Sequence, residues 1–464
     1  MSLHTLEIEG LRGFAKPERL ELAIPNGNFG SGLTVLVGPN NGGKSTIIEA
    51  FAAFSREDPK LPDHGPSFAK GMRNLEAGGR VHLRATSPNG TVAEISTIDA
   101  GGSETTWHTG RIGAVVLPAR RFFNPFFEKF PDYMHPSTYF NMGEHPTLRN
   151  SPLNRFYERI FRAHSDKESF NQLLGRIIHP VPQWNIEQTD DGKYYLQFQY
   201  DNSSHSSDGL GDGVLSIWCI VDALYDASEK QMIVIDEPEQ SIHPSWQKNL
   251  FEVLGEFAKD RQIVYATHSP YFINWDAVFN GAQIVRVHKP KDDERTVLSA
   301  LKQETVKLLQ NLVKDNHNPH TLGLEAREIF FLQDSVVLVE GQEDIIQYKL
   351  IAEQLECAIP GDFFGWGVGG ADKMPIIAQM LFELGFRKVV GILDKDKEHV
   401  KQQLDEKFPS FKFFVIPADD VCSKKPKKSK PAKDGLVKDG RLQERYRTEV
   451  KQLLGEIKSA LSDD

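Results

Sequence analysis

Apolar and polar positions follow strand-like patterns over the first hundred residues. Thr5–Glu9 alternates apolar with acidic side chains, as a half-buried strand does, and Leu33–Val37 is a continuous apolar run typical of a buried strand. An apolar helical pattern follows Lys44. Glycine and asparagine residues between 76 and 110 favour hairpins, one of them turning at Pro88–Gly90. The pattern predicts a strand-rich start that contains a strand–loop–helix unit.

The middle of the chain, residues 120–179, is aromatic and helical in character. Five phenylalanines crowd into one short stretch: Phe122, Phe123, Phe126, Phe127 and Phe130. Aromatic clusters are more often buried than exposed, so packing of an inserted helical subdomain at about 120–180 is favoured, with a DNA-stacking surface as the alternative. Sheet-like sequence returns at Lys193–Tyr200, and a helix at Val214–Ala227 leads into a strand at Met232–Ile235.

The last third of the chain alternates between strand-type and helix-type blocks. Strands are predicted at Ser335–Val339, Phe363–Val368, Val389–Leu393 and Phe411–Ile416, with helices at Asp344–Leu355, Met374–Leu384 and Leu442–Leu461. Such alternation predicts a parallel sheet and an α/β fold. The polar, helical stretch Thr305–Arg327 is placed between the domains, with the boundary near Glu325. The expected domains are therefore residues 1–325 and 326–464.

Composition narrows the class of protein. A chain of 464 residues has room for two or three domains, and 39% hydrophobic with 25% charged residues is ordinary for a soluble globular protein. No apolar run approaches the roughly 20 residues of a membrane span, so no membrane partner is expected. The N-terminus lacks signal-peptide features, and three widely spaced cysteines suggest neither a metal knuckle nor a disulfide framework. A cytoplasmic location is expected.

A net charge of −10 argues against a surface covered in phosphate contacts, although a nucleic-acid footprint can be local. Lysines and arginines are dense in the segment Lys424–Arg441. A solvated loop is the simpler interpretation of such a run, and a path for a DNA backbone is the alternative.

The sequence GPNNGGKST at Gly38–Thr46 has the spacing of a phosphate-binding loop. Its glycines let backbone N–H groups face phosphate oxygens, and the following helix offers its positive end. Lys44 would reach the β- and γ-phosphates of a nucleotide such as ATP, and Ser45 would bind its Mg²⁺. The candidate nucleotide contacts in this loop are Asn40, Gly43, Lys44, Ser45 and Thr46.

Two later segments complete this candidate nucleotide site. An apolar strand ends in Asp236-Glu237-Pro238, so two carboxylates emerge together at the end of the strand. Asp236 would hold the Mg²⁺ through its water shell, and Glu237 would polarise the attacking water as the catalytic base. His268 follows the predicted strand Ile263–Ala266 and could contact the γ-phosphate; alone, it would pass for an ordinary histidine at a strand end.

The order GPNNGGKST, IDEPEQSIHP and ATHS resembles the ABC-type ATPases of DNA repair and phage defence. The resemblance implies that two ATPase heads sandwich ATP, with a serine- and glycine-rich loop of one head completing the site of the other. The segment Ser206–Ser216 is the matching candidate, although it departs from the transporter-type LSGGQ sequence. Its candidate contacts are Ser207, Gly209, Gly211 and Gly213. Arg120 is a candidate for the lid loop of the nucleotide site.

Carboxylates also end two strands of the second predicted domain. Glu340 ends one strand, and Asp394 and Asp396 end another. Residues i and i+2 of an extended segment face the same side, so this pair could aim at one ion. Clustered carboxylates at the carboxyl ends of parallel strands suit Mg²⁺ or Mn²⁺. Further acidic candidates, of lower rank, are Asp344, Asp419 and Asp420.

The set Glu340-Gly341…Asp394-x-Asp396 resembles a TOPRIM domain, with Gly369-Gly370 at a turn of that fold. An ABC-type ATPase followed by TOPRIM is the architecture of the OLD (overcoming lysogenization defect) family nucleases. The resemblance implies metal-dependent DNA cleavage, ATP as a regulator, assembly into homo-oligomers through the heads, and a role in phage defence. It leaves open a further defence-system protein as partner.

Three alternative functions compete with a metal-dependent DNA nuclease. The main alternative is an ATPase sensor or DNA clamp whose TOPRIM unit does not cleave. Intact carboxylates at Glu340, Asp394 and Asp396 argue against it, because clustered like charges destabilise a protein and an inactive site would not need them. A topoisomerase would need a nucleophilic tyrosine on a separate domain, and a primase would leave the ATPase unexplained.

Overall fold

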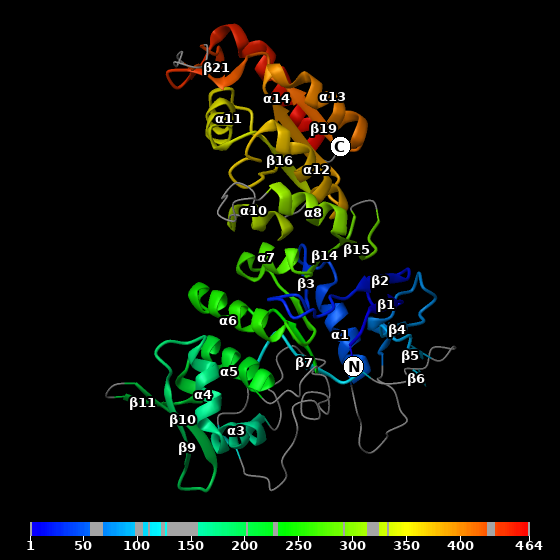
Figure 1. Ribbon diagram of the computed structural model, residues 1–464, viewed down its shortest axis with the longest axis vertical. Coiled ribbons are helices and arrows are strands. Elements are labelled where there is room, and N and C mark those ends of the chain that lie inside the picture. The colour runs from blue at the N-terminus through cyan, green and yellow to red at the C-terminus, as the bar shows by residue number, and fades with distance from the viewer. Residues whose placement is uncertain are drawn as a thin grey trace. The chain divides into compact units, whose positions relative to one another are not determined.

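A computed structural model describes most of the chain. The described residues are 2–55, 68–97, 105–109, 112–121, 126–127, 156–200, 203–225, 231–290, 293–312, 324–331, 334–424 and 432–462. They divide into two compact units, Met1–Leu298 and Ser299–Asp464 (Figure 1). Most of the phenylalanine cluster at 122–130 lies outside the described residues, as do the contacts of its side chains, so its predicted role is untested.

The first unit is built on a sheet of parallel strands. Among the described residues its strand order is β15-β14-β3-β13-β12-β7. The strands are β3 (Leu33–Val37), β7 (Ala114–Leu117), β12 (Met232–Asp236), β13 (Ile263–Ala266), β14 (Gln283–His288) and β15 (Val297–Ala300). Strands β7, β12, β13, β3 and β14 pair in parallel. Every residue of β3, β12 and β13 is buried, which explains their continuous apolar runs.

A second, antiparallel sheet of the same unit has the order β2-β1-β4-β5-β6 over the described residues. Its strands are β1 (Thr5–Glu9), β2 (Glu18–Glu21), β4 (His82–Thr86), β5 (Val92–Thr97) and β6 (Thr105–Thr109). Helix α1 (Lys44–Ser55) packs in one core with side chains of both sheets. Apolar residues therefore surround it on most sides, as a buried helix requires.

Helices and short strands complete the first unit. They are α3 (Phe156–Ser165), α4 (Lys167–Gly175), α5 (Asp212–Tyr225), α6 (Pro244–Phe257), α7 (Trp275–Phe279), β8 (Phe126–Phe127), β9 (Gln183–Gln188), β10 (Tyr194–Tyr200) and β11 (Ser203–Ser206). Trp184 of β9 and Phe170 of α4 pack on Trp218 of α5, with ring centroids 5.0 and 4.5 Å from that of Trp218. Arg159 of α3 forms a two-pronged ion pair with Asp222 of α5, at 3.0 and 3.1 Å, and both side chains are fully buried.

The second unit contains the predicted parallel sheet, in the order β17-β16-β18-β19 over the described residues. Its strands are β16 (Ser335–Leu338), β17 (Asp362–Phe363), β18 (Lys388–Leu393) and β19 (Lys412–Val415), and its helices are α8 (Gln303–Leu312), α10 (Leu324–Glu328), α11 (Gln342–Gln354), α12 (Met374–Glu383), α13 (Glu398–Lys407) and α14 (Arg447–Leu461). Helices α11 and α14 share one core with Val337, Val390 and Ile392 of the sheet (Figure 1). The predicted apolar stripe of the last helix docks there.

The structure differs from the sequence expectation in three places. The units divide between Leu298 and Ser299 rather than near Glu325, because Glu383 of α12 binds Lys302 N and Thr305 Oγ1 and so holds the start of α8 in the second unit. Strand β17 is two residues long, and β-bridge and turn geometry replaces the rest of the predicted strand. A small sheet of β20 (Asp420–Cys422), β21 (Gly435–Lys438) and β22 (Arg441–Leu442) was not predicted.

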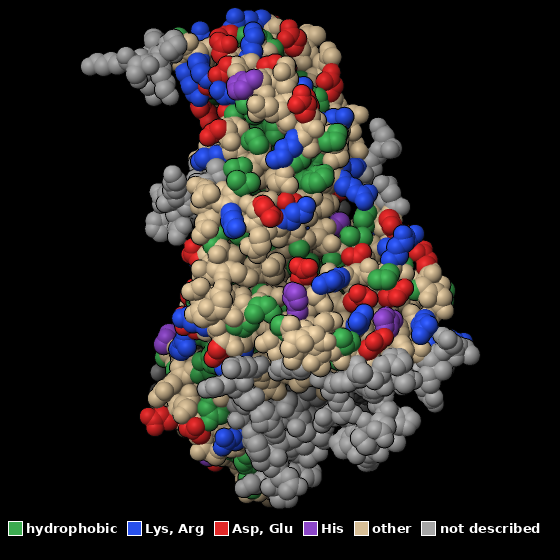
Figure 2. Space-filling model, turned by 45° about the vertical axis from the view of Figure 1, so that its right-hand side comes forward, with side chains coloured by type: hydrophobic (Ala, Val, Ile, Leu, Met, Phe, Trp, Pro, Cys, Tyr) green, Lys and Arg blue, Asp and Glu red, His purple; other side chains and the backbone are tan. Residues whose placement is uncertain are grey.

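Basic and acidic side chains intermingle on the surface drawn in Figure 2, so the net charge is not gathered there in one field of a single sign. Within the described part of the chain, none of the helices combines the length and the apolar character that crossing a bilayer requires.

The buried ion pair of Arg159 and Asp222 predicts how substitutions change the free energy of unfolding. Removing one partner leaves the other charged and unpaired in the core, so Asp222→Ala should lower the free energy of unfolding by about 3–5 kcal/mol. The double variant Arg159→Met/Asp222→Leu removes both charges and should recover most of that loss. Urea unfolding followed by tryptophan fluorescence measures both. A double variant no more stable than Asp222→Ala would show that the pair does not act as a unit.

Candidate functional site

The predicted phosphate loop lies between β3 and α1, at the carboxyl end of a central parallel strand. Gly38 has φ of +127°, and a Cβ atom there would lie 2.3 Å from the carbonyl oxygen of Val287. The same carbonyl would meet a Cβ on Gly42. The loop is thus pressed against β14, and only glycine allows both its turn and this approach. It leads directly into α1, whose amino end favours anions.

Lys44 lies inside this loop. Its Nζ donates to the carbonyl oxygens of Gly38 and Pro39, at 2.9 and 3.0 Å, and the side chain is buried. Burial lowers the pKa of Lys44 to about 8, and the carboxylates of Asp236, Glu237 and Glu239 oppose that shift. The ammonium group is therefore held where the loop would enclose a phosphate.

The end of β12 brings the other predicted nucleotide residues to the same place. Asp236 Oδ1 lies 3.3 Å from the hydroxyl oxygen of Ser45, so the two predicted Mg²⁺ ligands of this site are adjacent. Glu237 has a left-handed backbone, with φ of +48°. Its N–H donates to Ala266 O at 2.8 Å, and its carbonyl oxygen accepts from Gln240 N at 3.1 Å. These bonds hold a conformation that costs an L-residue about 1 kcal/mol or more.

The buried arginine of this site is Arg121, whereas Arg120, the candidate for the lid loop, stays a prediction. The Arg120 side chain is exposed, whereas Arg121 is 4% exposed and its guanidinium donates to the carbonyl oxygens of Asp236 and Glu237, at 2.8 and 2.9 Å. Burial lowers the pKa of Arg121. The residues themselves give no reason to choose between two consecutive arginines; only the path of the chain after β7 decides which side chain turns inward.

His268 follows β13, as predicted, and lies near enough to Lys44 and Glu237 for their charges to act on its imidazole. Burial lowers the pKa of His268, and the Lys44 ammonium lowers it further, so the imidazole is neutral at pH 7. Glu239 holds this segment, since its carboxylate accepts from Thr267 Oγ1 and from the backbone N–H of His268. Burial raises the pKa of Glu239. The sequence analysis assigned no role to Glu239.

The candidate signature segment lies at the amino end of α5. Gly209 and Gly211 are exposed, and a Cβ on Gly211 would meet open space. Gly213 is packed, because a Cβ there would lie 2.3 Å from Ser241 O. Ser207 is 2% exposed, and its Oγ makes no hydrogen bond within the described residues. The two exposed glycines are therefore the predicted contacts that a second molecule could reach directly.

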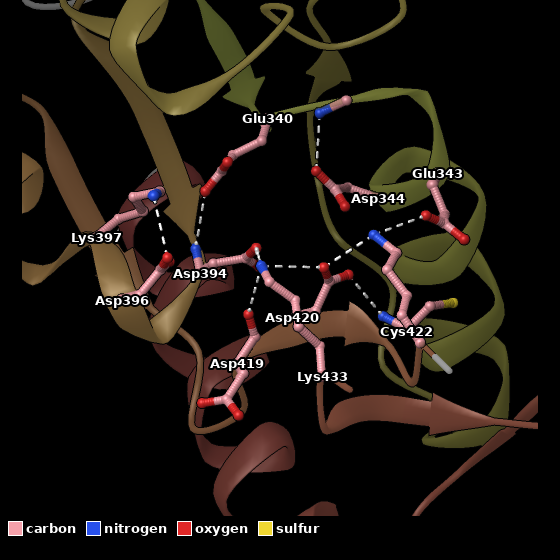
Figure 3. Close-up of polar contacts among 12 residues, drawn as sticks. Glu340, Glu343, Asp344, Asp394, Asp396, Lys397, Asp419, Asp420, Cys422 and Lys433 are labelled. Atoms are coloured by element: carbon pink, nitrogen blue, oxygen red, sulfur yellow. Dashed lines mark hydrogen bonds and ion pairs between the residues drawn. The ribbon is translucent and has the colours of Figure 1, made fainter. Parts of the chain in front are cut away.

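The second candidate site lies at the carboxyl edge of the parallel sheet in the second unit (Figure 3). Glu340 follows β16, and its Oε1 accepts from the backbone N–H of Asp394, which follows β18, at 3.1 Å. Asp344 lies in the first turn of α11 and accepts from Gly341 N at 2.8 Å. Asp420 begins β20 and is 5% exposed. The fold brings these four carboxylates, distant in sequence, into one cluster.

Burial and the neighbouring carboxylates raise the pKa of Asp394 and of Asp344. Burial raises the pKa of Asp394 to about 8, and Glu340, Asp420 and Asp344 add to the shift. Burial likewise raises the pKa of Asp344 to about 6, with further contributions from Glu340 and Asp420. Negative charge is thus concentrated beyond what the nearby lysines offset. Clustered carboxylates are the kind of ligand that a hard divalent cation prefers.

Two lysines reach into the carboxylate cluster. Lys424 Nζ lies 2.8 Å from Asp420 Oδ2, and Lys433 Nζ lies 3.4 Å from that oxygen and 3.8 Å from Asp394 Oδ2. Lys424 and Lys433 also pair through their backbones, at 3.0 Å in each direction. The described residues include no preformed cage of three or more metal ligands. The segment between the two lysines, 425–431, which is part of the predicted lysine-rich segment, lies outside the described residues.

The prediction for Asp396 rested on an extended backbone, and that premise is wrong. The strand ends at Leu393, and residues Lys395–Lys397 form a turn of 3₁₀ helix. The Asp396 side chain is 53% exposed and lies 3.1 Å from Lys397 Nζ (Figure 3). Asp394 and Asp396 therefore do not share one face of a strand. Of the two lower-ranked aspartates after β19, Asp420 is buried in the cluster and Asp419 is exposed.

Comparison with known proteins supports the nucleotide site. A family model described as "AAA domain, putative AbiEii toxin, Type IV TA system" matches residues 121–274, and one described as "AAA domain" matches residues 5–95. The chain is 24% identical to the OLD nuclease of Thermus scotoductus in an alignment 392 residues long that covers 70% of each protein.

Solved SMC head domains are also similar. One, bound to the C-terminal winged-helix domain of ScpA, has 12% identity and a TM-score of 0.44, covering 67% of this chain and all of that one. Another, from Thermotoga maritima, has 14% identity and a TM-score of 0.37, covering 65% of this chain and all of that one.

A phosphate loop, a strand ending in two carboxylates and a histidine after the next strand, all on one parallel sheet, define a P-loop ATPase head of the ABC type. The resemblance of the motifs to the OLD family is confirmed by the comparison, which covers most of the chain. The similarity to the OLD nuclease and the matched AAA domains fit an ATPase of the OLD family.

The raised pKa of Asp394 predicts how pH affects the metal-free protein. In the unfolded chain this carboxyl ionises near pH 3.8, but in the folded chain it keeps its proton up to about pH 8. Raising the pH across this window therefore favours unfolding, by at most about 1.4 kcal/mol per pH unit and by less because solvent still reaches part of the side chain. In EDTA, urea unfolding between pH 5 and 8 should show falling stability. Asp394→Asn should flatten the slope; an equal slope in that variant would contradict the assignment.

Proposed function

We propose that the protein is an ATP-regulated, divalent-metal-dependent DNA endonuclease, that its second unit is a TOPRIM domain, and that it acts in phage defence. The observation that carries the proposal is the cluster of Glu340, Asp344, Asp394 and Asp420 at the carboxyl edge of a parallel sheet, in a chain that also holds an ATPase site. The similarity to the OLD nuclease of Thermus scotoductus supports it.

Glu340 and Asp394 would be the principal ligands of Mg²⁺ or Mn²⁺ in this cluster, with Asp344 and Asp420 beside them. A divalent ion bound there would supply an activated water and would neutralise charge on the leaving oxygen of a phosphodiester. Asp396, on its 3₁₀ turn, is kept as a candidate ligand from the opposite side of Asp394 (Figure 3). Lys433, already against Asp394, is placed to pair with a DNA phosphate once the carboxylates hold an ion.

In the first unit, Lys44 and the loop around Gly43 would hold the phosphates of ATP, and Ser45 and Asp236 its Mg²⁺. Glu237 would be the base that activates the attacking water, with His268 beside the γ-phosphate. The exposed Gly209 and Gly211 fit contact with the nucleotide of a second head, so the active form would be a homo-oligomer joined through the heads.

The alternative is an ATPase sensor or DNA clamp whose second unit does not cleave. The clustering of Glu340, Asp344, Asp394 and Asp420 speaks against it, because gathered carboxylates are costly to keep unless a cation binds. Incubating supercoiled plasmid with Mg²⁺ or Mn²⁺, with and without ATP, separates the two functions.

Cleavage and ATP hydrolysis should be separable by mutation. Asp394→Ala removes a principal carboxylate of the second unit and leaves Lys44, Asp236 and Glu237 intact, so plasmid nicking should be lost while phosphate release continues. Lys44→Ala should abolish ATP binding and affect cleavage only through regulation. Both variants are assayed for plasmid nicking and phosphate release.

Asp405→Ala is the matched control for this pair, because it removes a half-exposed carboxylate of α13 in the same unit. Nicking by Asp394→Ala at the wild-type rate would rule out the nuclease site and leave the sensor or clamp.

Glu237→Gln should retain ATP binding and lose hydrolysis. Removing a general base costs roughly 10²–10⁴-fold in rate, and a trapped ATP should increase the share of oligomer. Phosphate release and size-exclusion chromatography with ATP measure the two effects. Glu256→Gln on α6, a solvent-exposed site in the same unit, is the control. Full turnover by a monomeric Glu237→Gln protein would refute both the base assignment and the need for two heads.

A further inference from the structure

Arg121 connects three elements that meet at the nucleotide site. Its guanidinium donates through Nη1 to Pro118 O, at 2.7 Å, just after β7, and through Nε to Ser216 Oγ of α5, at 3.0 Å. Its remaining bonds go to the carbonyl oxygens of Asp236 and Glu237, at 2.8 and 2.9 Å. One buried side chain thus joins the end of β7, the end of β12 and the helix that follows the signature segment.

The geometry at Glu237 explains why a guanidinium is needed. The left-handed backbone of Glu237 turns its carbonyl away from the sheet ladder, and Arg121 is one of two donors that this oxygen receives. Nη1 and Nη2 donate to two consecutive carbonyl oxygens, and the planar guanidinium can reach both at once. A lysine ammonium is a single point and cannot match both. The positive charge also lies among the carboxylates of Asp236, Glu237 and Glu239, which offset its burial.

We propose that Arg121 is a positioning residue for ATP hydrolysis: it fixes the backbone of Glu237, and so its carboxylate, and ties it to α5. This rests on the proposed role of Glu237 as the base. Because α5 begins directly after the exposed Gly209 and Gly211, the same side chain links the hydrolytic end of one nucleotide site to the segment offered to the other.

Arg121→Lys tests the proposal, since it keeps the charge and loses the fork. A base displaced by about an ångström costs on the order of 100-fold, so kcat should fall about 10–100-fold. The affinity for a fluorescent ATP analogue should stay within about twofold, because Lys44 and the phosphate loop are untouched. Arg84→Lys, at an exposed position of β4 in the same unit, should match the wild type in both. A loss of affinity as large as the loss of kcat would overturn the positioning role.

A double variant distinguishes positioning from general stability. If Arg121 acts through Glu237, adding Arg121→Lys to Glu237→Gln should lower the residual rate by less than about twofold, whereas independent effects would multiply. Multiplied losses would overturn the proposal. Thermal melting of each variant shows that the compared proteins are folded.

If Arg121→Lys does not fold, Ser216→Ala gives the second test. It removes only the bond between Arg121 and α5, so kcat should fall about 2–10-fold with ATP affinity retained. An unchanged kcat would refute the tie to α5. If the wild-type protein has no ATPase activity, the proposed role of Glu237 is refuted. If the wild-type protein is active and the Arg121→Lys variant is equally active, only the positioning role of Arg121 is refuted.

Discussion

Carboxylates gathered at the carboxyl ends of parallel strands repel one another, and both units are organised around the cations that offset this repulsion. The arrangement is inherent in the fold, because neighbouring parallel strands end at the same edge and deliver their next residues to one place. In the first unit Lys44 and Arg121 face Asp236, Glu237 and Glu239. In the second, Lys424 and Lys433 face Asp420 and Asp394. Without these cations, neither edge could hold its charges close together at neutral pH.

The two units meet this constraint in different ways. Lys44 and Arg121 are buried and bonded to main-chain carbonyls, so their positions are fixed by the backbone itself. Lys424 and Lys433 keep 47% and 39% of their side chains exposed and are joined by a β-bridge outside the parallel sheet. The first arrangement suits a site whose cations must be in place before the ligand arrives. In the second, burial and the neighbouring carboxylates still raise the pKa of Asp394, and Lys433 opposes this shift only in part.

Much of the fold was predictable because burial dictates its pattern. Strands β1, β3 and β13 have the predicted bounds. The motif residues Lys44, Ser45, Asp236 and His268 lie together because each one follows or ends a strand of the same parallel sheet. The TOPRIM assignment, the role of each carboxylate and the signature contacts remain predictions. Asp396 shows the limit of such reasoning, since an i, i+2 argument fails where a 3₁₀ turn follows the strand directly.

The residues that sequence reasoning missed share one property: their importance comes from burial rather than from a motif. Arg120 and Arg121 are consecutive residues of the same type, and so are Asp419 and Asp420. In each pair one side chain is buried and the other is exposed. A buried charge must find partners, so its hydrogen bonds report what it holds in place. For Arg121 those partners are the carbonyls of the two residues that the nucleotide site needs most. Burial therefore identifies supporting residues at the point where motif spacing stops being informative.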